Sequence, residues 1–260
     1  MKTQYDVVVI GAGIIGLSIA WEVARRSDLS IAVIEKGAGI GEGSTGASSA
    51  ICRHRYSLDE LVQLASDGIG AYRNWPEFTG LSEPQAAFQN DTVLWMPGSD
   101  TEWAEREHVR MQRLGIATSV LDDDDLQERF PALSPCTIAP DTETGEAHVC
   151  SGGGRHLLEL DGGWMDPMAA AQDLVAACRS KGVDIRFRSR VVDIEMQGGR
   201  VSGMRLDSDE PIATPVLINA AGPWCRDLYE AAGLNLRWDL KPTRIQMLYR
   251  DRPADLPGQI

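Results

Sequence analysis

The stretch Asp6-Val-Val-Val-Ile-Gly-Ala-Gly-Ile-Ile-Gly-Leu-Ser-Ile-Ala20, closed by Val33-Ile34-Glu35, decides the fold of this chain. Its pattern predicts a strand, a glycine turn, a helix and a parallel strand that ends in an acid. Gly11 permits the tight turn, Gly13 leaves the backbone open to a pyrophosphate, and Gly16 lets the helix pack on the strand. Glu35 ends the second strand, where a carboxylate accepts hydrogen bonds from ribose hydroxyls. The stretch predicts an adenine dinucleotide site, with a plain βαβ unit that binds no ligand as the alternative.

Composition limits the other function classes. The chain has 260 residues, enough for one large or two small domains, and a net charge of −13 that argues against nucleic acid or anionic membrane as a partner. No stretch approaches the ~20 apolar residues of a membrane span. No histidine or cysteine has metal-ligand spacing, so we expect no metal site, and the five cysteines form no CxxC pair. Unpatterned cysteines are typical of reduced thiols in a cytoplasmic protein.

Hydrophobic periodicity predicts the remaining elements. The predicted helices are Ile14–Arg26, Ser57–Thr79, Thr101–Leu114, a short helix that Asp122–Asp125 opens and that stops at Phe130-Pro131, Asp166–Lys181 and a helix that ends at Ala232. The predicted strands are Tyr5–Ile10, Ile31–Glu35, Thr92–Met96, Ile185–Arg188, Val191–Met196, Val201–Leu206 and Thr214–Asn219, with Pro135–Arg155 as a loop. This order predicts an α/β fold in which a Rossmann-like domain, 1–56 and 164–234, is interrupted by an α+β substrate domain, 57–163 and 235–260.

Two segments allow more than one interpretation. The loop Gly37–Ala50 is rich in small residues, which indicates either a flexible linker or a backbone that closely approaches a bound cofactor. The run Asp122–Asp125 indicates either a metal site or acids that complement a helix dipole, and we favour the dipole.

Two distant segments resemble the D-amino-acid oxidase superfamily, which includes glycine oxidase and the sarcosine oxidases. The first is Gly43-Ser-Thr-Gly-Ala-Ser-Ser-Ala-Ile-Cys-Arg-His-Arg-Tyr56, similar to the flavin-contacting segment of monomeric sarcosine oxidase. The second runs from Gly163-Trp-Met-Asp-Pro167 through Gly199-Arg-Val201 to Asn219-Ala-Ala-Gly-Pro-Trp224. The resemblance implies a Rossmann-like FAD-binding domain of the glutathione-reductase type. It also implies that the chain lacks the family's C-terminal part, so that the substrate domain is incomplete.

The resemblance also implies which residues bind FAD. The pyrophosphate would lie on the glycine turn, and Glu35 and Lys36 would bind the adenosine. Ser44, Thr45, Ser49 and Ala50 would follow the cofactor to the flavin ring. The full set of expected cofactor-binding residues is Gly11, Ala12, Gly13, Ile14, Ile15, Gly16, Glu35, Lys36, Gly43, Ser44, Thr45, Ser49, Ala50, Val191, Ala221 and Gly222. No histidine occurs between Gly37 and Arg53, so the resemblance implies noncovalent FAD.

For the substrate, Arg53 matches an arginine that binds a carboxylate in sarcosine oxidase, a role suited to a guanidinium fork. The alternative is a basic surface cluster of Arg53, His54 and Arg55. His54 and Tyr56 are candidates for proton transfer. Ala50 and Gly46 stand where sarcosine oxidase has an arginine and a histidine, which argues against sarcosine itself as the substrate.

These points predict an oxidoreductase that oxidises the C–N bond of an amino acid or N-substituted amino acid by hydride transfer to flavin. Its partner would be a small-molecule amine or amino-acid substrate. The alternative is an FAD-binding subunit or non-catalytic relative that needs a complementing chain. An NAD(P)-linked dehydrogenase is a third hypothesis, which the sarcosine-oxidase-like loop argues against.

Overall fold

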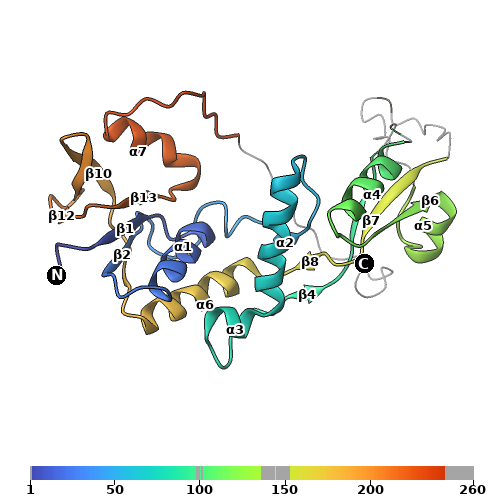
Figure 1. Ribbon diagram of the computed structural model, residues 1–260, viewed down its shortest axis with the longest axis horizontal. Coiled ribbons are helices and arrows are strands. Elements are labelled where there is room, and N and C mark those ends of the chain that lie inside the picture. The colour runs from blue at the N-terminus through green and yellow to red at the C-terminus, as the bar shows by residue number, and fades with distance from the viewer. Residues whose placement is uncertain (1, 98–99, 101, 136–143, 145–152, 244–260) are drawn as a thin grey trace. The chain divides into compact units, whose positions relative to one another are not determined.

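The computed structural model describes residues 2–97, 100, 102–135, 144 and 153–243, and these form two compact units (Figure 1). The first unit comprises the described residues up to Ala50, Asn74–Ala87 and those from Met165 onward. The second comprises Ile51–Arg73 and the described residues of Phe88–Trp164.

A parallel sheet with the strand order β13-β1-β2-β9 forms the centre of the first unit. Its strands are β1 (Val7–Ile10), β2 (Ile31–Ile34), β9 (Asp184–Arg186) and β13 (Leu217–Asn219). Helix α1 (Ile14–Ala24) connects β1 to β2, so the predicted strand–helix–strand opening and its parallel pairing are confirmed. β2 and β13 flank β1 on opposite sides. The strand order therefore reverses at the carboxyl end of β1, the position at which open α/β sheets bind ligands.

Both faces of this sheet are covered, which explains why its strands are continuous apolar runs. Val8 and Ile34 share a core with residues of the antiparallel sheet β10 (Val191–Gln197), β11 (Arg200–Leu206) and β12 (Pro211–Ala213). Ile10 packs with Leu228 of α7 (Cys225–Ala231), which follows the 3-10 turn η1 (Gly222–Trp224). Helices α1 and α6 (Pro167–Ser180) pack on each other.

The segment 74–87 is fixed to α6 by one buried carboxylate. Asp173, only 2% exposed, accepts hydrogen bonds from Trp75 Nε1, Gln85 N and Ala86 N, each at 2.9 Å. The donors belong to α3 (Trp75–Thr79) and to the chain that follows it. A single acid of α6 therefore holds a segment about ninety residues away in sequence.

The second unit is built on two small antiparallel sheets. One has the strand order β5-β7-β6, with β5 (Val93–Trp95), β6 (Thr118–Asp122) and β7 (Arg155–Glu159). The other has the order β3-β8-β4, with β3 (Ile51–Cys52), β4 (Gln89–Asn90) and β8 (Gly163–Trp164). Three helices complete the unit: α2 (Asp59–Arg73), α4 (Trp103–Arg113) and α5 (Asp123–Arg129). Met111 of α4 packs with Val62 of α2.

Several sequence predictions need correction here. The predicted helix Ser57–Thr79 is two helices, α2 and α3, separated at Asn74. Pro76 lacks an N–H and is tolerated in the first turn of a helix, so a new helix begins beside it. Arg155 belongs to β7 and not to a loop, and the rest of the predicted loop lies almost entirely outside the described residues. β6 was not predicted, because Thr118–Asp122 is short and only partly alternating.

The acidic run caps a helix. Asp122 accepts a hydrogen bond from Asp125 N at 2.9 Å, and the Asp125 carboxylate accepts one from Asp122 N at 3.3 Å. This reciprocal capping box begins α5, the short helix that the run was predicted to open. Nowhere in the ranges that the structure describes is there a helix long and apolar enough to span a membrane.

Candidate cofactor and substrate sites

The glycine turn is packed so closely that two of its positions exclude any side chain. Gly11 has φ +111°, and a Cβ there would lie 2.4 Å from the carbonyl oxygen of Ala220. A Cβ on Gly16 would lie 2.0 Å from the carbonyl oxygen of Gly11. Both distances are far below van der Waals contact, so the first turn of α1 can approach β1 and β13 only because these residues are glycine.

The N-terminus of α1 presents backbone donors. Gly13 is its extended N-cap and contributes no side chain, and the Ile14 amide donates to Thr45 Oγ1 at 3.0 Å. The other amides of a first helical turn have no acceptor within the helix. Ile15, in this turn, is 64% exposed. Free amides, the positive end of the helix dipole and a missing side chain suit a phosphate group.

Glu35 lies directly beside this turn, as its predicted role requires. Its carboxylate accepts hydrogen bonds from Ala12 N at 2.8 Å and from Gly37 N at 2.7 Å. The backbone of Glu35 accepts a hydrogen bond from Ser189 N at 2.9 Å, so the chain that enters β10 at Val191 lies alongside. The tertiary structure thus brings the chain before Val191, another of the expected cofactor-binding residues, next to Glu35.

Lys36 and Gly43 meet at an aromatic ring. Lys36 Nζ lies 3.2 Å from the centroid of Trp224, and a Cβ on Gly43 would lie 3.4 Å from the same ring. Burial, together with the positive charge of Arg190, lowers the pKa of Lys36 below its ordinary value. Trp224 ends the family-like segment Asn219–Trp224, and the sequence alone did not predict a role for it.

The loop 37–50 folds back onto the glycine turn. Gly41 N donates to Ala12 O at 3.3 Å, and buried Thr45 supports the first turn of α1 through its hydroxyl. Ser44 and Ser49 are exposed. Ala50 has φ +54°, a left-handed conformation that costs about 1–3 kcal/mol for a residue other than glycine. These contacts fix the loop against the glycine turn, which argues against a flexible linker, and close approach of its backbone to a cofactor stays a prediction.

The last two expected cofactor residues, Ala221 and Gly222, follow β13 and lie near the glycine turn. Ala220 N donates to Ile10 O at 2.9 Å, so the chain after β13 runs beside the chain after β1. Ala221 N donates to Asn219 Oδ1 at 3.3 Å, and Gly222 begins η1 with φ +54°. All the cofactor-binding residues expected from the sequence therefore lie in the first unit.

We expect Glu35→Gln to weaken FAD binding about tenfold, because a charged acceptor contributes about 1.5–3 kcal/mol to a hydrogen bond and the amide keeps part of it. The measurement is a titration of the apoprotein with FAD. Glu77→Gln is the control, since Glu77 is an exposed acid of the same unit and belongs to α3. Equal affinities for Glu35→Gln and the control would remove Glu35 from the cofactor site.

The second unit holds Arg53, His54 and Tyr56. The guanidinium carbon of Arg53 lies 4.7 Å from the Trp95 ring centroid and 5.0 Å from that of Tyr56. Among the described residues no acid forms an ion pair with Arg53, and no acceptor takes a hydrogen bond from its guanidinium. We call Arg53, Tyr56 and Trp95 the arginine site.

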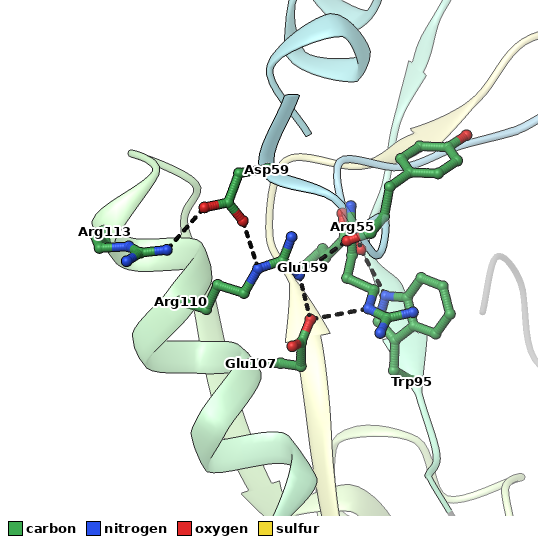
Figure 2. A network of polar contacts seen from close by, with 8 residues as sticks. Arg55, Asp59, Trp95, Glu107, Arg110, Arg113 and Glu159 are labelled. Atoms are coloured by element: carbon green, nitrogen blue, oxygen red, sulfur yellow. Dashed lines mark hydrogen bonds and ion pairs between the residues drawn. The ribbon is translucent and has the colours of Figure 1, made fainter. Parts of the chain in front are cut away.

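The nearby arginines Arg55, Arg110 and Arg113 differ from Arg53, because each of them forms an ion pair with an acidic side chain (Figure 2). Arg55 Nε pairs with Glu107 at 3.0 Å, and Glu107 also pairs with Arg110 at 3.0 Å. Asp59 then bridges Arg110 and Arg113, at 2.8 Å from each. Arg55 and Arg110 thus serve the internal packing of the unit.

His54 is buried and engaged on both sides. Its Nδ1 lies 3.0 Å from Ser66 Oγ, and its Nε2 lies 3.4 Å from the Asp161 carbonyl oxygen. Tyr56 is 37% exposed. His54 and Tyr56, the two candidates for proton transfer, follow Arg53 closely in sequence. The structure buries the His54 side chain and leaves that of Tyr56 partly exposed.

Two further residues of functional interest, Glu159 and Trp95, have no motif around them that predicts a role. Glu159 is a fully buried acid, and Trp95 hydrogen-bonds to it. The signal available in the sequence was an acid inside the apolar run Leu157–Leu160, a position that a charged group occupies only when it is hydrogen-bonded.

Two of the thiols in the part of the chain that the structure describes, Cys52 and Cys178, lie where burial disfavours the thiolate. Burial raises the pKa of the Cys52 thiol to about 11 and that of Cys178 to about 12, so both stay protonated at neutral pH. No group of three or more His, Cys, Asp or Glu in these parts could hold a metal ion.

Comparison with known proteins identifies the family. The model of the family described as "FAD dependent oxidoreductase" (DAO) matches residues 6–258 of the chain. The chain belongs to the DAO family of FAD-dependent oxidoreductases. FAD is the cofactor of this family, which favours FAD over NAD(P) for the site on the glycine turn.

Individual DAO relatives are distant and longer. Hydrogen cyanide synthase subunit HcnC of Pseudomonas aeruginosa is 27% identical over 97% of this chain, which covers 66% of HcnC. Sarcosine oxidase subunit beta of Rhodobacter capsulatus is 28% identical over 78% of the chain, 46% of that subunit. The L-proline dehydrogenase structure from P. horikoshii superposes with a TM-score of 0.76 at 21% identity, over 91% of this chain and 58% of that one. This likeness confirms the predicted fold class, and the chain spans between about half and two thirds of these relatives' lengths.

Proposed function

We propose that this DAO family chain binds FAD noncovalently in its first unit and oxidises the C–N bond of an amino acid or N-substituted amino acid. The residues present fit the cofactor, because the glycine turn, the free amides of α1 and Glu35 supply a phosphate site and a ribose acceptor on one edge of the sheet. FAD supplies, when bound, the acceptor for the two electrons of this oxidation.

The observation that carries the substrate class is the arginine site. The Arg53 guanidinium carbon lies 4.7 Å from the Trp95 ring centroid and 5.0 Å from that of Tyr56, and these cation–π contacts leave its N–H groups without a hydrogen-bond acceptor among the described residues. A carboxylate fits that edge in two parallel charge-assisted hydrogen bonds. Arg53 has no acid partner among the described residues, whereas the neighbouring Arg55 is paired. Arg53 is therefore the residue that binds the substrate carboxylate.

The names of relatives agree with this class. Sarcosine oxidase and L-proline dehydrogenase are named for amino acids that carry a carboxylate and an amine. Because the sequence differs from sarcosine oxidase at Gly46 and Ala50, we propose the class and not sarcosine itself.

His54 and Tyr56 have different roles in this proposal. The partially exposed Tyr56 flanks the guanidinium and is the candidate proton acceptor. The buried His54 ring, engaged at both nitrogens, supports the chain beside Arg53. The cytoplasmic location and the domain boundaries 1–56, 57–163, 164–234 and 235–260 stay predictions.

The test is an absorption spectrum of the purified FAD-loaded chain, repeated without oxygen in the presence of amino acids and N-methyl amines. We expect loss of the oxidised flavin bands with at least one carboxylate-bearing amine. Arg53→Lys should weaken the apparent affinity for that substrate about a hundredfold, with a smaller change in the reduction rate at saturation, because an ammonium cannot form the two-pronged contact.

Arg205→Lys is the matched control, since Arg205 is a half-exposed cation paired with Asp193 in the first unit. A chain that takes up no FAD would contradict the proposal as a whole. Reduction that is equally effective in Arg53→Lys would contradict the substrate site alone.

A second candidate function is an FAD-binding subunit that needs a complementing chain. The specific observation is that two relatives are named as subunits of larger enzymes, HcnC and sarcosine oxidase subunit beta. FAD uptake without reduction by any amine would favour this candidate. Co-purification from the source cell, followed by the same anaerobic titration, would then show whether a second chain restores reduction.

A further inference from the structure

Glu159 is the last residue of β7, and its side chain is completely buried. A buried carboxylate is costly unless donors surround it. Three donors do: Trp95 Nε1 at 2.6 Å, His54 N at 2.7 Å and Arg55 N at 3.2 Å. Figure 2 shows this carboxylate beside Arg55 and Trp95.

Each of the three donors belongs to the surroundings of Arg53. The two amides are those of the residues that directly follow Arg53, so they set the course of the backbone from which its side chain leaves. The third donor is the indole whose ring faces the Arg53 guanidinium at 4.7 Å. One carboxylate therefore fixes both the backbone and one aromatic wall of the arginine site.

Glu159 does this without neutralising the cation. Neutral N–H groups occupy its oxygens, and it forms no ion pair with any residue in the described part of the chain. The adjacent acid Glu107 behaves differently, because it pairs directly with Arg55 and Arg110. In this unit Glu159 therefore positions the surroundings of Arg53, whereas Glu107 neutralises Arg55 and Arg110. Arg53 itself stays available to an external anion.

We infer that Glu159 is a positioning residue for substrate recognition: through Trp95 and the backbone of His54 and Arg55 it holds the Arg53 guanidinium in the orientation that binds a carboxylate. This inference rests on the proposed function, in which Arg53 binds the substrate carboxylate. It predicts that Glu159 affects carboxylate affinity more than FAD affinity.

The experiment is calorimetric titration of the FAD-loaded chain with two probes, acetate and propionate, which carry the carboxylate but no amine that the flavin could oxidise. Glu159→Gln should weaken binding of both about tenfold, because an amide group would turn an N–H toward one of the three donors. Trp95→Phe keeps an aromatic wall but removes the anchoring N–H, and should weaken binding about threefold. Glu102→Gln is the control, since Glu102 is 86% exposed and belongs to the same unit.

A second readout tests the anchor without any ligand. The Trp95 indole N–H is identified in a nitrogen–proton NMR spectrum by its absence in Trp95→Phe. In the wild type it should exchange slowly with solvent, and in Glu159→Gln it should shift and exchange at least tenfold faster. The FAD affinity of both variants should equal that of the wild type, because the cofactor residues lie in the first unit, and the dispersion of the remaining signals in the same spectrum shows whether the second unit is folded.

The outcomes separate the two proposals. If Arg53→Ala abolishes probe binding while Glu159→Gln and Trp95→Phe bind as tightly as the control, the positioning role is wrong and the proposed function stands. If the wild type binds neither probe, or Arg53→Ala binds them equally well, the carboxylate site fails and the positioning role fails with it. If Glu159→Gln does not fold, the affinity of Trp95→Phe decides.

Discussion

Gly16→Ala is expected to lower the free energy of unfolding by about 2 kcal/mol and to weaken FAD binding at least a hundredfold. The new methyl group would lie 2.0 Å from the carbonyl oxygen of Gly11, so either α1 or the glycine turn has to move. Overpacking of this kind costs about 1–3 kcal/mol or more, and the helix propensity of alanine offsets only about 1 kcal/mol. Because that movement displaces the amides of the first turn, folding and cofactor affinity should fall together.

The chain supplies a matched control for this change. Gly68 lies inside α2, and a Cβ there would meet nothing within 4 Å. Gly68→Ala should therefore raise stability by about 0.5–1 kcal/mol, since alanine loses less backbone entropy than glycine in a helix. Urea unfolding and FAD titration of both variants give the comparison. A stable Gly16→Ala that still binds FAD would mean that the close contact between α1 and the turn is not needed.

Asp173→Ala is expected to destabilise the first unit by about 3–5 kcal/mol. The substitution leaves Trp75 Nε1 and the amides of Gln85 and Ala86 without their acceptor. Each unsatisfied buried donor costs about 1–3 kcal/mol, reduced where water enters the space. The segment 74–87 should then detach from α6, which can be followed by hydrogen exchange at Gln85 and Ala86 together with urea unfolding.

Asp173→Asn should lie between the alanine variant and the wild type. Its amide oxygen can still accept from the donors of one carboxylate oxygen, while its NH₂ group faces the remaining donor. Asp67→Ala is the neutral control, because Asp67 is exposed on α2. If Asp173→Ala and Asp67→Ala unfold at the same urea concentration, the three hydrogen bonds contribute nothing net to stability.

The two sites differ in what holds them. The cofactor site depends on missing side chains, at Gly11, Gly13 and Gly16, so that backbone groups can approach one another and a ligand. The arginine site depends on contacts between side chains: Trp95 donates a hydrogen bond to Glu159, and the Trp95 ring makes a cation–π contact with Arg53. Substitutions should therefore act by steric overlap in the first unit and by lost hydrogen bonds in the second.

The sequence by itself determined the opening of the fold. Val7–Ile10, α1 and Ile31–Ile34 follow local periods, and the glycine spacing is a local requirement of the turn between them, so a short window contains the whole signal. The same holds for α6, where Asp166 caps the N-terminus and Pro167 follows it. Family membership came from motifs of this local kind, and the comparisons confirmed it.

The tertiary structure alone decided which side chains meet. Glu159 lies about one hundred residues from His54 and Arg55 in sequence, and Asp173 lies almost as far from the donors that it binds. Nothing in the periodicity of either segment specifies such a partner, because a hydrogen bond between distant residues depends on how strands and helices pack and not on their spacing. For the same reason the sequence could name Arg53, Arg55 and Arg110 as cations, but only the packed unit distinguishes the two that acids neutralise from the one that stays available to a ligand.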